Sequence, residues 1–200
     1  MKVFGIDPGS ERTGYGCVET DGRRHRLVTC GAISTAGAPT LAARLATIHS
    51  RLSALLSECR PDVVAIENLF YATNVRSALT LGHARGVAML SAVEAGLELA
   101  EYTPTEIKRA VVGYGRAEKA QVGQMIALLL GLDAPPTPHD ASDALAVALC
   151  HVHQQPAAAA VAALAGRRTR VPASMRSWRA YRPADAAPAP RRPRQGQGRS

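Results

Sequence analysis

The sequence lacks the features that mark membrane, secreted and disulfide-stabilised proteins. No apolar run approaches the ~18 residues of a membrane-spanning helix, and the first residues lead into a strand pattern rather than a signal peptide. The four cysteines form no C-x-x-C pair, and His151 and His153 have no further ligand at zinc-finger spacing. We therefore expect a cytoplasmic protein with free buried thiols, no zinc site and solvated histidines at a helix end.

Acidic residues are almost absent from the end of the chain. Residues 167–200 contain ten arginines and one acid, Asp185, and therefore carry a net charge of +9, whereas residues 1–166 carry −1. This arginine- and proline-rich segment has no apolar periodicity and is predicted to be disordered. We divide the chain into a folded domain of residues 1–156 and a basic, Pro/Ala/Arg-rich tail of residues 157–200. The tail is either a solubilising extension or an arm that binds a phosphate backbone.

Apolar periodicity predicts an α/β fold. Strand patterns occur over residues 2–6, 13–18, 26–33, 63–66 and 97–102, and helix patterns over residues 40–59, 74–94, 104–112, 118–130 and 140–154. Asp21-Gly22 marks a hairpin between the second and third strands, whereas the later strands are joined through helices. This order predicts a mixed sheet covered by helices. Residues 157–165 either extend the last helix or form a linker.

Four carboxylates stand at positions where they could form one site. Asp7 and Glu67 each end an apolar strand, and Asp140 and Asp143 share one face at the start of the last helix. If the two strands are parallel neighbours, their carboxyl ends meet at the edge where open α/β sheets place their sites. Taken alone, Asp7 could be a turn residue and Asp140 a helix-start residue favoured by the helix dipole. The four together favour a functional cluster.

A cluster of carboxylates needs compensating positive charge, because neighbouring like charges raise one another's pKa values. Ligands that are all oxygen favour Mg²⁺ or Mn²⁺ over zinc or copper. Two such ions can activate a water and hold a scissile phosphate. The acids therefore predict a two-metal hydrolytic site that uses Mg²⁺, with Mn²⁺ as a possible substitute.

Five blocks of sequence surround these acids and other polar residues, in a fixed order over about residues 1–153. They are Gly5-Ile6-Asp7-Pro8-Gly9-Ser10 with Thr13-Gly14-Tyr15-Gly16, Ala65-Ile66-Glu67-Asn68-Leu69-Phe70, Ala78-Leu79-x-Leu81-Gly82-x-Ala84-Arg85-Gly86, Val111-Val112-Gly113-x-Gly115-x-Ala117-Glu118-Lys119, and Asp140-Ala141-x-Asp143-Ala144-Leu145-Ala146. Together they resemble the RuvC family of crossover junction endodeoxyribonucleases. The first block alone also opens actin-like ATPases, but five blocks in order are specific.

The resemblance implies an RNase H-like fold with a five-stranded mixed sheet. It implies a homodimer that resolves Holliday junctions by paired symmetric nicks during recombination and DNA repair. Asp7, Glu67, Asp140 and Asp143 are then the catalytic acids that bind two Mg²⁺ ions per site. His139 lies four residues before Asp143 and could assist them. The implied partners are four-way junction DNA and the branch-migration proteins RuvA and RuvB.

The resemblance also assigns DNA contacts. Phe70 follows Glu67 by three residues and would stack on an unpaired base at the crossover, unless Tyr71 takes that role. Lys108 and Lys119 resemble lysines that contact phosphates in the family.

The long helix over residues 74–94 carries two further features. Arg76 and Arg85 serve either DNA binding or a dimer contact, and Gly82 and Gly86 allow another helix to approach closely. We therefore place the dimer interface at these glycines.

Two other functions remain open: an RNase H-fold nuclease acting on structured RNA, and a junction-binding protein without catalysis, against which the four intact acids argue.

Overall fold

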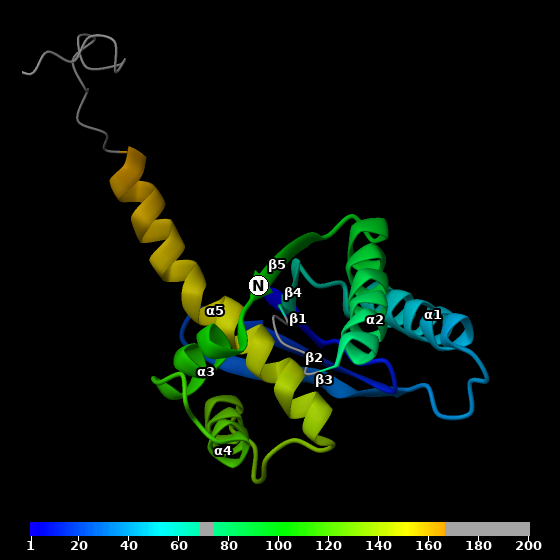
Figure 1. Ribbon diagram of the computed structural model, residues 1–200. Helices are drawn as coiled ribbons and strands as arrows, with labels where there is room; N and C mark the ends of the chain where they lie inside the picture. Colours follow the sequence, from blue (N-terminus) through cyan, green and yellow to red (C-terminus); the bar gives the residue numbers. More distant parts are fainter. Residues whose placement is uncertain (69–73, 167–200) are drawn as a thin grey trace, which may run out of the picture. The chain divides into compact units, whose positions relative to one another are not determined.

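The computed structural model describes residues 1–68 and 74–166 and forms a sheet with helices on both faces (Figure 1). The strands are β1 (Lys2–Asp7), β2 (Arg12–Thr20), β3 (His25–Ser34), β4 (Val63–Glu67) and β5 (Glu98–Tyr102). The helices are α1 (Leu41–Cys59), α2 (Val75–Glu94), α3 (Pro104–Val112), α4 (Lys119–Leu130) and α5 (His139–Gly166).

The sheet is mixed and has the order β3-β2-β1-β4-β5. β1 pairs with β2, and β2 with β3, in antiparallel fashion, because a short turn joins each pair. β4 lies parallel to both β1 and β5, because α1 and α2 carry the chain back between these strands. The expected five-stranded mixed sheet flanked by helices is confirmed.

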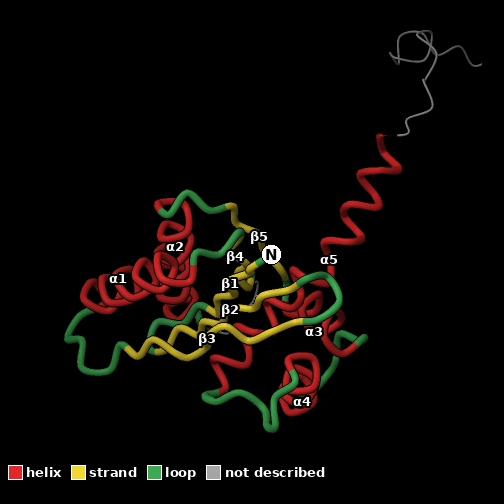
Figure 2. The backbone as a smooth tube through the Cα atoms, turned by 180° about the vertical axis from the view of Figure 1, so that it is seen from behind, coloured by secondary structure: helices red, strands yellow, loops and turns green. Residues whose placement is uncertain are grey.

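The two faces of the sheet bury different cores. In β1, Phe4 and Ile6 point to the face covered by α1 and α2, whereas Val3 points to the face covered by α3, α4 and α5 (Figure 2). This alternation follows from the two-residue period of a strand. Both faces of β1 and β4 are buried, which explains why these strands read as continuous apolar runs.

The compact part of the chain spans Met1–Ala159, and α5 continues to Gly166. Residues 157–165 thus extend the last helix, and the boundary expected at residue 156 lies within it. Residues 167–200 lie outside the described residues, so the disorder of the tail stays a prediction. Among the helices of the described part, none is long and apolar enough to cross a membrane.

The sequence prediction for the histidines of α5 was wrong. His151 is only 7% exposed, and its Nδ1 lies 2.8 Å from the hydroxyl of Tyr102. His153 is half-buried, with Nδ1 2.9 Å from the carbonyl oxygen of Ala110. Both rings are covered because α5 packs against α3 as well as against the sheet, whose edge strand β5 contacts His151. The cysteines are free thiols as expected, and three of the four are buried.

Glycines let α5 lie unusually close to β1 and β2. A Cβ atom on Gly5 would lie 2.0 Å from the carbonyl oxygen of Ala144, and one on Gly14 would lie 2.0 Å from that of Asp140. No side chain fits at either position, so the backbone of the helix rests directly on the backbone of the strands. The glycines of the first sequence block therefore place the start of α5, with its acids, over the carboxyl end of β1.

We expect Gly5→Ala to lower the free energy of unfolding by about 3 kcal/mol, because the added methyl group overlaps main-chain atoms that cannot rotate away. Urea unfolding followed by circular dichroism measures this loss. The matched control is Gly123→Ala in α4, where the nearest atom to an added Cβ lies 3.5 Å away, in Pro135. Equal stabilities of the two variants would show that the approach of α5 is not limited by this contact.

Candidate active site

Asp7 and Glu67 lie side by side at the carboxyl ends of neighbouring strands. Asp7 is the last residue of β1 and Glu67 the last of β4, and the parallel register pairs Ile6 with Ile66 immediately before them. Two carboxylates therefore project from adjacent strands at one edge of the sheet. This is the juxtaposition that the two apolar strands predicted.

A cavity of about 400 Å³ at this edge collects three of the four predicted acids and both predicted lysines. Asp7 and Glu67 come from the sheet, Lys108 from α3, Lys119 from the start of α4, and Asp143 from the first turns of α5. The rest of the wall is formed by Pro8, Leu81, Pro104, Ile107, Val122 and Ala146. Five elements thus bring opposite charges together in a partly apolar hollow.

Both sheet carboxylates have raised pKa values. Burial raises the pKa of Asp7 to about 8, and the neighbouring charge of Glu67 and a hydrogen bond with it add to the rise. Burial also raises the pKa of Glu67. Burial and the proximity of a second carboxylate both disfavour the ionised form when no cation compensates the charge.

The helix acids are compensated by basic side chains instead. The Lys119 ammonium donates to Asp143 Oδ2 at 2.7 Å, and this contact raises the pKa of Lys119. The Arg12 guanidinium lies with Nε 3.0 Å from Asp140 Oδ2. Each of the two helix acids therefore has a basic partner, a lysine for Asp143 and an arginine for Asp140.

Asp140 departs from the predicted arrangement. Its carboxylate pairs with Arg12 and does not line the cavity that holds the other three acids. His139 lines a separate hollow of about 270 Å³ beside α4, which Lys119 and Asp143 also border. Sequence reasoning missed Arg12, because its partner is remote in sequence and no pattern links the two. The roles of Asp140 and His139 as metal-site residues stay predictions.

The donor chemistry of the cavity fits a hard divalent cation. Its candidate ligands are all carboxylate oxygens, and the burial and the neighbouring Glu67 charge that raise the pKa of Asp7 would be compensated by a bound cation. Within residues 1–68 and 74–166, no three His, Cys, Asp or Glu side chains are arranged to hold one ion as they stand. Asp7, Glu67 and Asp143 would hold the metal once the contact of Lys119 with Asp143 is released.

The other predicted DNA contacts are placed differently. Arg76 is exposed in the first turn of α2, where it is free to reach a ligand. Arg85 turns inward, since its Nε lies 3.3 Å from the carbonyl oxygen of Glu67 and its guanidinium pairs with Glu101. Arg85 thus stabilises the end of the strand that carries Glu67. The sequence did not reveal this role of Arg85. Phe70 and Tyr71 lie outside the described residues.

The predicted dimer glycines lie on an exposed face of α2. Gly82 and Gly86 are exposed, and apart from the backbone of α2 itself no atom of the described residues lies within 4 Å of a Cβ built on either. Large apolar side chains flank them on the same helix, with exposed fractions of 77% for Val75, 61% for Leu79, 49% for Leu90 and 64% for Val93. Together with the two glycines these residues recur every three or four positions, which places all six on one side of the helix.

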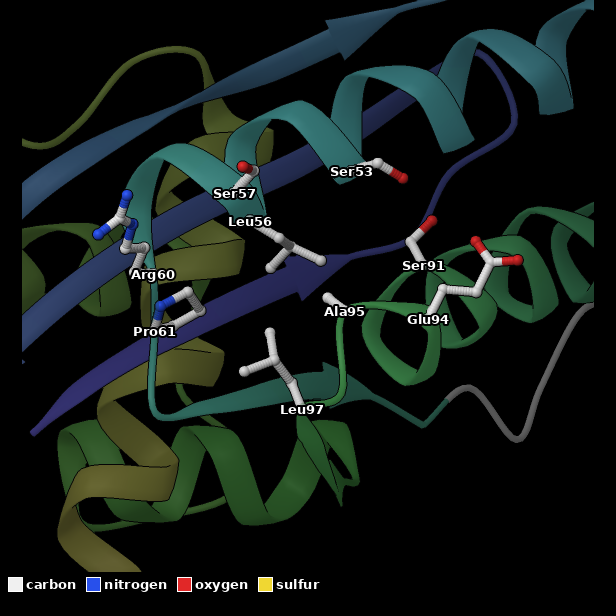
Figure 3. A pocket seen from close by; sticks show the side chains of 9 residues that line it. All are labelled: Ser53, Leu56, Ser57, Arg60, Pro61, Ser91, Glu94, Ala95 and Leu97. Carbon is white, nitrogen blue, oxygen red and sulfur yellow. The ribbon is translucent and has the colours of Figure 1, made fainter.

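A third hollow, of about 580 Å³, lies between the ends of α1 and α2 (Figure 3). Leu56 and Leu97 form its floor, and Arg60 and Glu94 stand at its rim. Its one carboxylate, Glu94, already pairs with His49. This hollow lacks clustered titratable groups and does not compete with the acidic cavity as a site for chemistry.

Comparisons with known proteins agree with this geometry. The family model described as crossover junction endodeoxyribonuclease RuvC matches residues 3–151. The crossover junction endodeoxyribonuclease RuvC of Syntrophotalea carbinolica is 54% identical over 153 residues, which cover 76% of this chain and 94% of that protein. The structure of Thermus thermophilus RuvC superimposes with a TM-score of 0.73 at 34% identity, covering 79% of this chain and 97% of that one.

A further structure, T. thermophilus RuvC in complex with a Holliday junction substrate, gives a TM-score of 0.72 at 32% identity and covers 78% of this chain and 96% of that one. The fold and the acidic edge define an RNase H-like nuclease. Within that class, the chain belongs to the RuvC family of crossover junction endodeoxyribonucleases.

Proposed function

We propose that this chain is a Mg²⁺-dependent resolvase that cuts four-way DNA junctions by paired nicks. The observation that carries the proposal is the cavity in which Asp7, Glu67 and Asp143 meet Lys108 and Lys119. Acids suited to divalent cations and bases suited to phosphates converge there at one edge of the sheet. The same hollow can therefore position both the metal and the scissile phosphodiester.

The acids and the lysines of the cavity have separate roles in the proposed hydrolysis of the phosphodiester. Two bound Mg²⁺ ions would supply a nucleophilic water and stabilise the charge that develops on the phosphate. Asp7 and Glu67 hold the ions against the rigid end of the sheet, and Asp143 closes the site from α5. Lys119 leaves Asp143 and moves to the phosphate, while Lys108 neutralises a neighbouring phosphate. Asp140 completes the ligand set once it separates from Arg12, with His139 available beside it.

We further propose that the enzyme acts as a homodimer in the cytoplasm. A two-fold axis through the α2 face around Gly82 and Gly86 would bury the exposed Leu79, Leu90 and Val93 against a second copy. Two sites related in this way match the two strands of like polarity that a resolvase cuts. Four-way junction DNA is the substrate, and RuvA and RuvB are the proposed partners that deliver it.

A synthetic four-way junction tests the proposal most directly. The full chain should cut the junction in Mg²⁺ or Mn²⁺, bind it without cutting in Ca²⁺, and not cut it in EDTA. A linear duplex of the same sequence and a structured RNA of similar size serve as controls. Cleavage of the RNA in preference to the junction would support the alternative RNA nuclease, and binding without cleavage in Mg²⁺ would support an inactive junction-binding protein.

Phe70→Ala should reduce junction cleavage by about tenfold with little loss of binding, because stacking on one unpaired base is worth ~1–3 kcal/mol at the crossover. Tyr71→Ala is the matched variant at the adjacent position. Single-turnover cleavage and gel-shift binding separate the two effects. A larger loss in Tyr71→Ala would transfer the stacking role to Tyr71, and unfolding of Phe70→Ala would make Phe70 a core residue.

Deletion of residues 167–200 should weaken DNA binding at low salt and flatten its salt dependence. Each phosphate neutralised contributes a slope of about −0.9 in log K against log salt, so engagement of most of the +9 charge removes several units. Preference for junction over duplex should remain, because disordered arginines contact the backbone rather than the branch geometry. An unchanged slope after truncation would leave the tail as a solubilising extension.

A further inference from the structure

A hollow of about 700 Å³ lies at the amino end of β1, the opposite end of the strand from Asp7. It is formed where the β2–β3 hairpin meets the middle of α5. Two histidines from these different elements, His25 and His153, face it together. Its other lining residues are Met1, Thr20, Asp21, Gly22, Val152 and Gln155.

A hydrogen bond of each ring places its Nδ1 against an oxygen atom. Nδ1 of His153 lies 2.9 Å from the carbonyl oxygen of Ala110, which can only accept, so this nitrogen is protonated and Nε2 of the neutral ring keeps its lone pair. Nδ1 of His25 lies 2.9 Å from the Thr20 hydroxyl, which also lies 3.2 Å from the carbonyl oxygen of Arg24. When the hydroxyl donates to Arg24, His25 donates through Nδ1 and its Nε2 keeps its lone pair as well.

Burial and the neighbouring charge of His153 lower the pKa of His25, which favours the neutral ring. Hydrogen bonds from Nδ1 to a carbonyl and to a hydroxyl are the kind of contact that orients metal-binding histidines through their second nitrogen. The contact with Ala110 thus holds the His153 ring in the tautomer that metal binding through Nε2 requires, and the Thr20 hydroxyl can do the same for His25.

The spacing of the two rings matches a shared ion. A Zn–N bond of ~2.0–2.1 Å puts the centre of an imidazole ring about 3.2 Å from the ion, so two rings at the tetrahedral angle have centres about 5.2 Å apart. The ring centroids of His25 and His153 are 5.4 Å apart, with their planes at 58°. The centres of the two rings are therefore separated as in a pair of histidines that share an ion.

We propose that His25 and His153 bind a Zn²⁺ ion through their Nε2 atoms in this hollow, with water completing its coordination. The nitrogen ligands favour borderline cations such as Zn²⁺ over Mg²⁺, whereas the carboxylate cavity at the other end of β1 has the opposite preference. The site joins the β2–β3 hairpin to α5. Ion binding therefore links two elements that otherwise meet across an open hollow.

Isothermal titration of Zn²⁺ into the full chain, without an affinity tag and in excess Mg²⁺ to occupy the carboxylates, tests the site. The wild type should bind one equivalent, and His25→Gln and His153→Gln should each weaken binding at least about tenfold. Thr20→Val keeps both imidazoles but removes the hydroxyl that orients His25, and should weaken binding about 10- to 100-fold. His49→Gln, which alters a histidine paired with Glu94 at the surface, should bind like the wild type.

Electron paramagnetic resonance with Cu²⁺ as the probe gives a second readout. The wild-type spectrum should show hyperfine coupling to two imidazole nitrogens, and His153→Gln should show coupling to one. The proposal is overturned if the wild type binds no Zn²⁺ in excess Mg²⁺. It is also overturned if His25→Gln and His153→Gln, both shown to be folded by circular dichroism, bind Zn²⁺ as tightly as His49→Gln.

Discussion

Asp7→Asn should reduce junction cleavage in Mg²⁺ by about 10³-fold or more, while junction binding stays intact or becomes tighter. The substitution keeps the size of the side chain but removes a proposed metal ligand from the end of β1, and a catalytic metal supplies several kcal/mol of transition-state stabilisation. Single-turnover cleavage and gel-shift binding in Ca²⁺ measure the two properties. Full cleavage by this variant at saturating Mg²⁺ would remove Asp7 from the catalytic site.

The same substitution should raise stability in EDTA at alkaline pH. The pKa of Asp7 is raised from 3.8 to about 8 in the folded protein, so between these values the folded state retains a proton that the unfolded chain has released. Stability of the wild type therefore falls as pH rises through this range, and Asn removes the effect. The melting temperature of Asp7→Asn should exceed that of the wild type by several degrees at pH 8 but not at pH 4.

Glu58→Gln supplies the control, because it removes an exposed carboxylate of α1 far from the cavity. It should change neither cleavage nor the pH dependence of melting. Mg²⁺ should stabilise the wild type more than Asp7→Asn, since metal binding competes with the proton for the same oxygens. Equal melting curves of wild type and Asp7→Asn at every pH would show that Asp7 is not a buried, repelled carboxyl group.

Gly86→Leu should convert the proposed dimer into monomers. In a two-fold interface the added side chain occurs twice, and overpacking of about 1–3 kcal/mol per copy weakens association ~30-fold or more. The fold itself should not change, because within residues 1–68 and 74–166 no atom beyond the backbone of α2 lies within 4 Å of a Cβ at this position. Sedimentation velocity measures the assembly, and unfolding in urea checks the fold.

Ala54→Leu adds similar bulk to an exposed position on α1 and should remain dimeric. With Gly86→Leu, the two nicks of a junction should lose their coordination, so that singly nicked products accumulate. A fully dimeric Gly86→Leu variant would place the interface on another face of the molecule. Monomers that still make paired nicks would show that dimerisation through α2 is not required for resolution.

The sequence predicted those positions in the site that depend on the order of the strands in the sheet. Asp7 and Glu67 each end a continuous apolar run, and such runs become neighbouring parallel strands whose ends must meet. The ends of the first four helices were predicted within one residue, whereas the last helix was expected to end at residue 154 and continues to Gly166. Thr40 and Thr103 cap the helices that follow them.

The sequence did not reveal contacts that depend on how elements pack. Arg12 with Asp140, and Arg85 with Glu101, join residues from different elements, and no local pattern encodes such pairs. His151 was predicted to be a solvated histidine at a helix end. Its ring is in fact buried against Tyr102 of β5, which is another contact between elements that no local pattern encodes.

The contact of α5 with the glycines of β1 and β2 has a consequence for how this enzyme tolerates change. The height of the acid-bearing helix above the sheet is set by main chain against main chain, at Gly5 and Gly14, and not by the volume of any side chain. Substitutions among the apolar residues of either core should therefore alter stability while the acids keep their positions. The position of the acids is set by this backbone contact, so the apolar residues of the surrounding core can be substituted without moving the acids.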